Sequence, residues 1–326
     1  GNYYSEENNN GLLKLVNTAI NARVNFNNKV DYIISTDQNN ESRVVIIDQN
    51  TGHTKDTSKF SDGLHQFLEI KENCKMTTEN QKLAITTYQD FFRQFQKLSG
   101  ASGSVNEKYA MEELSEIYGK DVVDVPRNTE RRRIDKKDAV YATTRAKDIA
   151  LITELIAVHQ TGQPILIGVT SEKEAEKYNR ILNNLNISHR TLTSSDSKEE
   201  NDIIAEAGQL GQITIATPVA GRGTDIKLSE ESKNAGGLFV FATERAESKR
   251  VDVQLRGRSG RQGDLGTTKM YNSFEDTVIK KYGDERFVSS EYIQKLNKKY
   301  GNEEITDNKL VALFDQAQKS ISINSF

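Results

Sequence analysis

The sequence has very little cysteine and proline, no tryptophan and no long hydrophobic run. The single Cys74 cannot form an internal disulfide, which favours a reducing compartment, so we expect a cytoplasmic protein. No apolar stretch approaches the ~20 residues that cross a bilayer, so no membrane-spanning helix is expected. One Cys and four scattered His cannot supply the clustered ligands of a closed zinc site, and we expect this chain to bind no metal by itself.

An excess of charge of either sign is also missing. The 326 residues hold 44 Lys+Arg against 47 Asp+Glu, which gives a formal charge of -3. No global positive field would therefore hold the chain on nucleic acid or on an acidic membrane, and any such binding must be local. At about 100–200 residues per domain, the length allows about two domains.

The first part of the chain mixes helical and extended patterns. Apolar residues at helical spacing predict an amphipathic helix over 11–24, and two β-rich runs at 30–34 and 43–48 predict a hairpin-like pair. Ser61-Asp62 is typical of a helix cap, and the aromatic residues of 88–98 predict the buried face of another helix. We expect His65 to face solvent within its helix.

From about Asp121, short apolar strands alternate with longer helical stretches, which predicts an α/β fold with a parallel sheet and crossover helices. Strands are expected at 122–125, 139–142, 165–169, 188–192, 213–217 and 238–243, with 270–273 as an edge strand, and helices at 144–160, 171–185 and 199–208. After Phe274 the chain becomes charged and helical. The run Arg131-Arg132-Arg133 is most simply a solvated loop.

A glycine-rich segment follows the strand expected at 213–217. Gly221, Arg222 and Gly223 precede Asp225 there. Ligands of open α/β sheets bind in loops at the carboxyl ends of the strands, where glycines let a backbone and a guanidinium approach a phosphate. Asp225 could hold a ribose hydroxyl or a metal-bound water. A bare turn without a ligand is an equally good interpretation of this segment alone.

Residues 254–264 are more informative, because Arg256, Arg258 and Arg261 fall close together with glycines between them. Guanidinium groups suit bidentate phosphate contacts, and an arginine at a transferring phosphoryl group can contribute ~10³ to 10⁵ in rate. A solvated basic face is the alternative. Glycine costs about 1 kcal/mol in a helix, so its repeated use favours a function, and we expect all three arginines to face a nucleotide.

The half of a site that grips the β- and γ-phosphates is missing from the sequence. The phosphate-loop pattern G-x-x-x-x-G-K-[ST] does not occur; the nearest approach, Gly119-Lys120, continues with Asp121. We therefore expect this chain to hydrolyse ATP poorly by itself.

These segments resemble the SecA preprotein translocase ATPase family, and more broadly the second motor lobe of helicase-like ATPases. The resemblance to SecA runs in order through 61–66, 80–81, 91–93, 214–226, 236–238 with 243–250, and 254–264, which covers nearly the whole chain. It implies a RecA-like lobe and four parts: 1–75, the later part of the preprotein cross-linking domain; 76–125, the C-terminal part of the first nucleotide-binding lobe; 126–284, the second lobe; and 285–326, the start of a helical scaffold.

The resemblance also implies roles for individual residues. Asp225 would contact the nucleotide with support from Arg222, Arg258 and Arg261 would sense or stabilise the γ-phosphate, and Gly221, Gly223 and Gln254 would complete the nucleotide site. The implied cofactor is ATP, with Mg²⁺ held mainly by residues outside this chain, since the family's phosphate loop and acidic magnesium motif would precede Gly1. The chain would then be a fragment.

The partners implied by the resemblance are an unfolded preprotein and a SecY-type membrane channel, with no nucleic acid, and a homodimer remains open. The location implied is cytoplasmic, peripheral at the inner face of the cell membrane. Residues 48–53 differ from the family's usual Asp-Glu-His-Thr-Gly-Arg, residues 100–104 from its Gly-Met-Thr-Gly-Thr, and residues 217–220 from its Thr-Asn-Met-Ala. These departures suggest an accessory SecA that exports a restricted set of proteins.

Two other interpretations stay open. The chain could be the second motor lobe of a nucleic-acid helicase, although the charge of -3 and the lack of a basic stripe with aromatic residues count against this. Residues 25–75 could instead form a peptide-binding module with exposed strand edges. For 44–47, burial in a core is at least as good an explanation.

Overall fold

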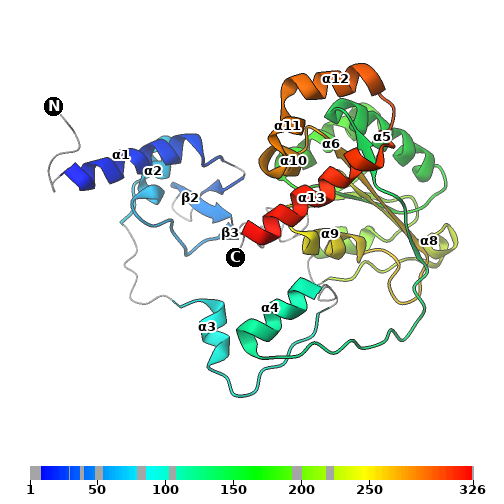
Figure 1. Cartoon of the computed structure of the whole chain (residues 1–326), viewed down its shortest axis with the longest axis horizontal. Helices are drawn as coiled ribbons and strands as arrows, with labels where there is room; N and C mark the ends of the chain where they lie inside the picture. The colour runs from blue at the N-terminus through cyan, green and yellow to red at the C-terminus, as the bar shows by residue number, and fades with distance from the viewer. Residues whose placement is uncertain are drawn as a thin grey trace. The chain divides into compact units, whose positions relative to one another are not determined.

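The computed structural model describes residues 9–28, 30–36, 40–47, 54–78, 86–102, 108–192, 200–217 and 224–324 (Figure 1). The chain divides into two compact units. The first comprises Gly1–Thr86 with Ser171–Lys173, and the second comprises Thr87–Thr170 with Glu174–Phe326. The four-part division implied by the resemblance stays a prediction.

The described residues of the first unit form a small antiparallel sheet and two helices. Its elements are α1 (Asn9–Val24), β1 (Tyr32–Thr36), β2 (Ser42–Ile47), β3 (Thr54–Lys55) and α2 (Leu64–Lys71). The strand order β1-β2-β3 confirms the predicted hairpin-like pair, with Tyr32 opposite Ile46. Val44, Val45 and Ile47 are buried, which confirms that 44–47 belong to the core.

Two local predictions for the first unit are wrong. Ser61-Asp62 does not cap α2, because the N-cap is Gly63, whose φ of 77° is a left-handed conformation that glycine adopts without strain. His65 does not face solvent. It is only 2% exposed, its ring packs beside Phe60, and its Nε2 lies 3.5 Å from Glu69 Oε1. A single polar residue buried among apolar ones leaves no signal in the spacing of apolar residues.

The second unit is built on a parallel sheet. Its strands are β4 (Arg133–Asp135), β5 (Ala139–Tyr141), β6 (Ile165–Gly168), β7 (Arg190–Leu192), β8 (Ile213–Ala216), β9 (Leu238–Ala242) and β10 (Gly266–Ser273). Their order is β4-β10-β9-β6-β8-β7, and β5 also pairs with β10. Every pairing in it is parallel, and β6, β8 and β9 are buried throughout, as in sheets covered on both faces. The predicted α/β class is confirmed.

The described helices of the second unit are α3 (Tyr88–Arg93), α4 (Lys108–Tyr118), α5 (Thr144–His159), α6 (Glu172–Asn184, whose first two residues are assigned to the first unit), α7 (Glu200–Glu206), α8 (Glu230–Asn234), α9 (Lys249–Arg256), α10 (Thr277–Tyr282), α11 (Glu285–Val288), α12 (Ser290–Tyr300) and α13 (Asn308–Asn324). One core cluster includes side chains of α5 and α6, and another those of α7 and α9. A third joins α10, α12 and α13 to β5. The predicted helical C-terminal tail therefore packs on the parallel sheet.

Three further expectations for the second unit are wrong. Residues 122–125 form no strand, and Val123 is 80% exposed. The strand at 270–273 is not at an edge, because β10 lies between β9 and β4. The aromatic face predicted at 88–98 is exposed, with Tyr88 at 81%, because apolar spacing identifies a face but not the surface that covers it.

Among the described helices, none has both the length and the apolar composition to cross a bilayer.

Candidate functional site

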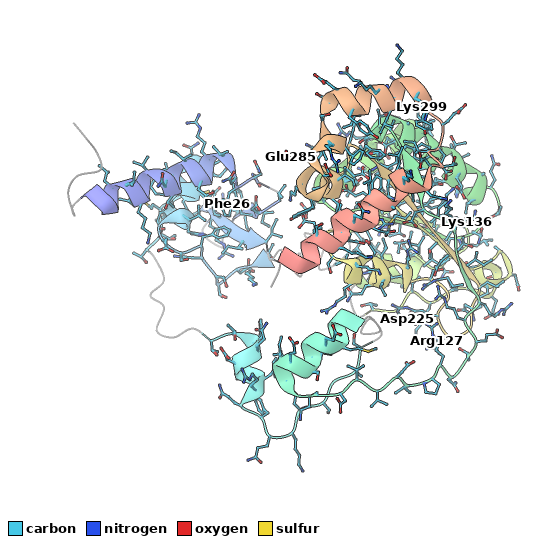
Figure 2. All side chains as sticks on the ribbon, in the orientation of Figure 1. Phe26, Arg127, Lys136, Asp225, Glu285 and Lys299 are labelled. Atoms are coloured by element: carbon cyan, nitrogen blue, oxygen red, sulfur yellow. The ribbon has the colours of Figure 1, made fainter. Side chains whose placement is uncertain are left out.

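Two residues singled out in the sequence, Arg261 and Asp225, form a direct ion pair. Arg261 Nη1 lies 2.7 Å from Asp225 Oδ1, and Arg261 Nε also donates to the carbonyl of Gly257 at 2.8 Å (Figure 2 labels Asp225). Both paired side chains are 43% exposed. An ion pair as exposed to solvent as this one contributes only about 0–1 kcal/mol to stability. Its main effect is therefore to orient two charged groups at the surface.

The pair lies toward the amino-terminal ends of the parallel strands. Ser259, just before Arg261, donates its hydroxyl to the carbonyl of Leu238, the first residue of β9, at 2.7 Å. Ser229, soon after Asp225, donates its amide to the carbonyl of Gly208 at 3.2 Å, and Gly208 precedes β8. The expectation that Asp225 sits at the carboxyl ends of the strands is therefore wrong.

The glycines between the arginines allow a close turn. Helix α9 ends at Arg256 with Gly257 as its C-cap, and Gly260 has a φ of 65°. A Cβ on Gly260 would lie 2.5 Å from the Cβ of Arg133, so a side chain does not fit there. The interruption of the helix by Gly-Arg-Ser-Gly-Arg thus has a structural cause, the close packing of this turn on the start of β4.

Arg256 and Arg261 are held by different carboxylates, Asp138 and Asp225. Arg256 Nη2 donates to Asp138 Oδ1 at 2.8 Å, and the carbonyl of Arg256 accepts from Arg133 Nη1 at 2.7 Å. The expectation that Arg256 faces a nucleotide together with Arg258 and Arg261 stays a prediction; its guanidinium is held by Asp138 and not by Asp225. Arg133, expected in a solvated loop, begins β4 and anchors the end of α9 instead.

The remaining predicted residues are only partly described. Arg258 is partly buried and its amide donates to the carbonyl of Leu255 at 3.0 Å. Gln254 lies one helical turn before Arg258 and is also partly buried. Gly221, Arg222 and Gly223 lie outside the described residues.

Several arginines surround this turn, and two of them form ion pairs with Asp138. Burial, and then repulsion from the neighbouring Arg131 and Arg256, lowers the pKa of Arg133 to about 10. Asp138 offsets part of this charge, since one of its oxygens accepts from Arg256 and the other from Arg245 Nη2 at 2.9 Å. Nothing in the sequence pointed to Asp138, which is the last of several charged residues before the short strand β5.

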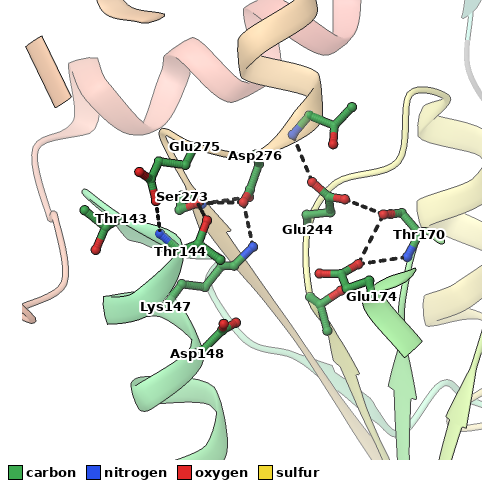
Figure 3. A network of polar contacts seen from close by, with 12 residues as sticks. Thr143, Thr144, Lys147, Asp148, Thr170, Glu174, Glu244, Ser273, Glu275 and Asp276 are labelled. Carbon is green, nitrogen blue, oxygen red and sulfur yellow. Dashed lines mark hydrogen bonds and ion pairs between the residues drawn. The ribbon is translucent and has the colours of Figure 1, made fainter. Parts of the chain in front are cut away.

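The carboxyl ends of β5, β6, β9 and β10 carry a separate polar network (Figure 3). Lys147 Nζ lies 2.6 Å from Asp276 Oδ1, with side chains 1% and 4% exposed. Asp276 Oδ2 also accepts from the amide of Ser273 at 2.7 Å. The network joins α5 to the start of α10, so this edge of the sheet is occupied by the chain's own contacts.

No metal site is evident in the part of the chain that the structure describes. There, no group of three or more His, Cys, Asp or Glu side chains could hold an ion. The chemistry available at the Arg261–Asp225 pair is instead that of half-exposed guanidinium and carboxylate groups, which suit a phosphorylated ligand that also carries hydroxyls.

Family models of two kinds match the chain. The SecA P-loop domain matches residues 130–235 and 227–301, and the SecA preprotein cross-linking domain matches residues 1–69. Together they cover most of the described residues of both units.

Individual relatives agree with the family models. The protein translocase subunit SecA of Clostridium tetani is 38% identical over 324 residues, 99% of this chain and 37% of that protein. That of Nitratidesulfovibrio vulgaris is 40% identical over 309 residues, 94% of this chain and 35% of that protein. The chain thus spans little more than a third of the length of these relatives. Among solved structures, the E. coli DEAD-box protein SrmB bound to RraA overlaps 47% of this chain and 83% of its own, at a TM-score of 0.34 and 20% identity.

Proposed function

The chain belongs to the SecA family of protein translocase subunits, and from that premise we propose that it is part of an ATP-driven protein-export motor. Its substrate would be an unfolded preprotein, moved through a SecY-type membrane channel. The match of residues 1–69 to the preprotein cross-linking domain supports a preprotein as the substrate.

The observation that carries the nucleotide half of this proposal is the contact between Arg261 and Asp225. A guanidinium fork suits phosphate oxygens, and a half-exposed carboxylate can accept a ribose hydroxyl. The residues present therefore fit the phosphate and ribose of ATP. Arg222, Gly221, Gly223 and Gln254 would complete the site, and Mg²⁺ would be held mainly by residues outside this chain.

In this role the arginines act by charge. ATP supplies the phosphoryl group that is transferred. Arg261 can exchange Asp225 for a phosphate oxygen, and Arg258, three residues earlier, adds a second positive charge against the γ-phosphate. Fixed positive charge of this kind stabilises the negative charge of phosphoryl transfer.

Because the phosphate-loop pattern is missing from the sequence, this chain should hydrolyse ATP poorly by itself. The departures at 48–53, 100–104 and 217–220 support an accessory export system; residues 48–53, 103–104 and 218–220 lie outside the described residues. The full protein would lie in the cytoplasm, peripheral to the inner face of the cell membrane, and could form a homodimer.

Amide-resolved NMR of this chain tests the proposal. Millimolar ATP should shift the amides near Asp225 and of 254–264, whereas RNA at low salt should shift none. Shifts caused by RNA that vanish at high salt would instead support the helicase interpretation, since phosphate contacts made by arginines weaken with salt.

A further inference from the structure

Four consecutive residues between β9 and α9 contact the C-terminal helices. They are Glu244, Arg245, Ala246 and Glu247. They belong to the segment 243–250, which resembles SecA, and the proposed function gives them no role. The helix that follows them is α9, whose end leads directly into Arg258 and Arg261. This loop therefore contacts the C-terminal helices and is joined through α9 to the arginines.

The two acidic residues of the loop hold α10. Glu244 Oε2 accepts from the amide of Thr277, the first residue of α10, at 3.0 Å, and its other oxygen accepts from the hydroxyl of Thr170 (Figure 3). Glu247 Oε1 lies 2.8 Å from Lys281 Nζ, and these two side chains are 48% and 57% exposed. The first contact is directional, while the second is a solvated ion pair.

The other two residues of the loop hold α13. Arg245 Nη1 lies 2.5 Å from Asp315 Oδ1 of α13. Gln318 Nε2 donates to the carbonyl of Ala246 at 2.9 Å and to Asp252 Oδ2 at 2.7 Å. Asp252 Oδ1 in turn accepts from the amide of Ala246 at 2.9 Å, so the three residues close a ring of hydrogen bonds.

This ring is buried and has a fixed geometry. Gln318 is 4% exposed and Asp252 is 8% exposed. Both protons of the Gln318 amide are used, one on each acceptor. Apolar contacts of Phe314 and Ala317 also hold α13 against the sheet, but such contacts tolerate sliding, whereas hydrogen bonds lose strength when donor and acceptor shift.

Asp252 lies in the first turn of α9, an eight-residue helix. A helix this short moves as one body, so a displacement at Asp252 is carried to the turn at its other end. We propose that Gln318 is a positioning residue for Arg258 and Arg261, acting through Asp252 and the loop of residues 244–247. The inference rests on the proposed function for what the arginines bind. In it, the position of α13 determines the position of the Arg258 and Arg261 side chains.

Hydrogen exchange of this chain, followed amide by amide, tests the coupling. Gln318→Glu replaces two donors by acceptors against the buried Asp252. Removing a hydrogen bond to a charged acceptor is roughly a ten- to hundred-fold effect, so the amides of 246–262 should exchange about ten-fold faster or more. The amides of β6 (165–168) should keep their rates.

The double variant Gln318→Glu with Asp252→Asn is the rescue. Its new amide group at position 252 can donate to the new carboxylate at position 318 and still accept from the backbone amide of Ala246, so one donor–acceptor pair between the two side chains is restored. Exchange of 246–262 should return part of the way toward the wild-type rate. Lys281→Ala, which breaks only the solvated pair with Glu247, is the control and should leave these amides unchanged.

The outcomes separate this inference from the proposed function. Unchanged exchange in Gln318→Glu, equal acceleration in β6, or no rescue by the double variant would overturn the coupling. Because exchange is measured without nucleotide, those results would leave the nucleotide proposal standing. Conversely, if the coupling holds but ATP shifts no amide near the arginines, the proposed function fails alone. If both hold, Gln318→Glu should weaken the ATP shifts and the double variant should restore them in part.

Discussion

Arg261 Nη1 lies 2.7 Å from Asp225 Oδ1, and this contact joins the turn after α9 to the segment after β8. The two side chains are equally exposed, at 43% each. They are exposed enough to exchange partners with a ligand and close enough to hold each other in its absence.

Arg261→Ala should reduce binding of ATP without unfolding the protein. An exposed pair contributes about 0–1 kcal/mol, so the free energy of unfolding in urea should change by no more than that. The ATP-induced amide shifts of 254–264 should be much weaker. Arg286→Ala, which breaks the solvated Arg286–Asp284 pair (2.5 Å), is the matched control and should alter neither quantity. A large loss of stability in Arg261→Ala would show that the pair is structural.

Gly260→Ala should destabilise the lobe through backbone strain and a clash. Its φ of 65° strains a residue with a Cβ, by about 1–3 kcal/mol, and the new Cβ would lie 2.5 Å from Arg133 Cβ. Gly211→Ala has a similar φ of 71° but open space around the Cβ, so it isolates the strain from the clash. Urea unfolding should show the larger loss for Gly260→Ala. Equal losses would contradict the close packing of the turn on β4.

Lys147→Ala should be strongly destabilising. The Lys147–Asp276 pair is buried, and removing one partner of a buried pair costs about 3–5 kcal/mol because the other charge is left without compensation. Lys281→Ala breaks an exposed pair that also involves α10, and should cost no more than about 1 kcal/mol. Thermal unfolding of the two variants makes the comparison; similar melting temperatures would mean that the Lys147 pair is open to water.

Asp252 should give stability an unusual pH dependence. Burial raises the pKa of its carboxyl from 3.8 to about 6, against the opposing hydrogen bonds from Gln318 and Ala246. The folded state therefore takes up a proton between about pH 6 and pH 4 that the unfolded state does not, and the contribution of this group to stability rises as the pH falls. The free energy of unfolding of wild type relative to Asp252→Asn should increase from pH 6 to pH 4. A flat difference would contradict the raised pKa.

The sheet of the second unit was predictable because its signal is local. Short apolar strands that alternate with helical stretches are typical of a parallel α/β sheet and of few other folds. The pattern predicted β6, β8 and β9 at the residues where they occur. The place of β10 was not predictable, since strand order depends on contacts between distant segments. The strand expected at 122–125 failed because nothing in the described structure pairs with it.

The candidate site was predictable only in part. Arg261 and Asp225 stood out because glycines lie near them in the sequence. The expectation that Asp225 lies at the carboxyl ends of the strands was wrong. Asp138, Asp252 and Gln318 could not have been selected in the same way. Each is one of several polar residues in its segment, so nothing local distinguishes it, and its role follows from a partner 66 or more residues away.

The most direct measurement of the central claim compares ATP with ADP by amide-resolved NMR of this chain. If Arg258 and Arg261 meet the γ-phosphate, ATP should shift the amides of 254–264 at lower concentration than ADP does, and Arg258→Ala should abolish that preference. Equal responses to the two nucleotides, or a preference that survives Arg258→Ala, would contradict the account.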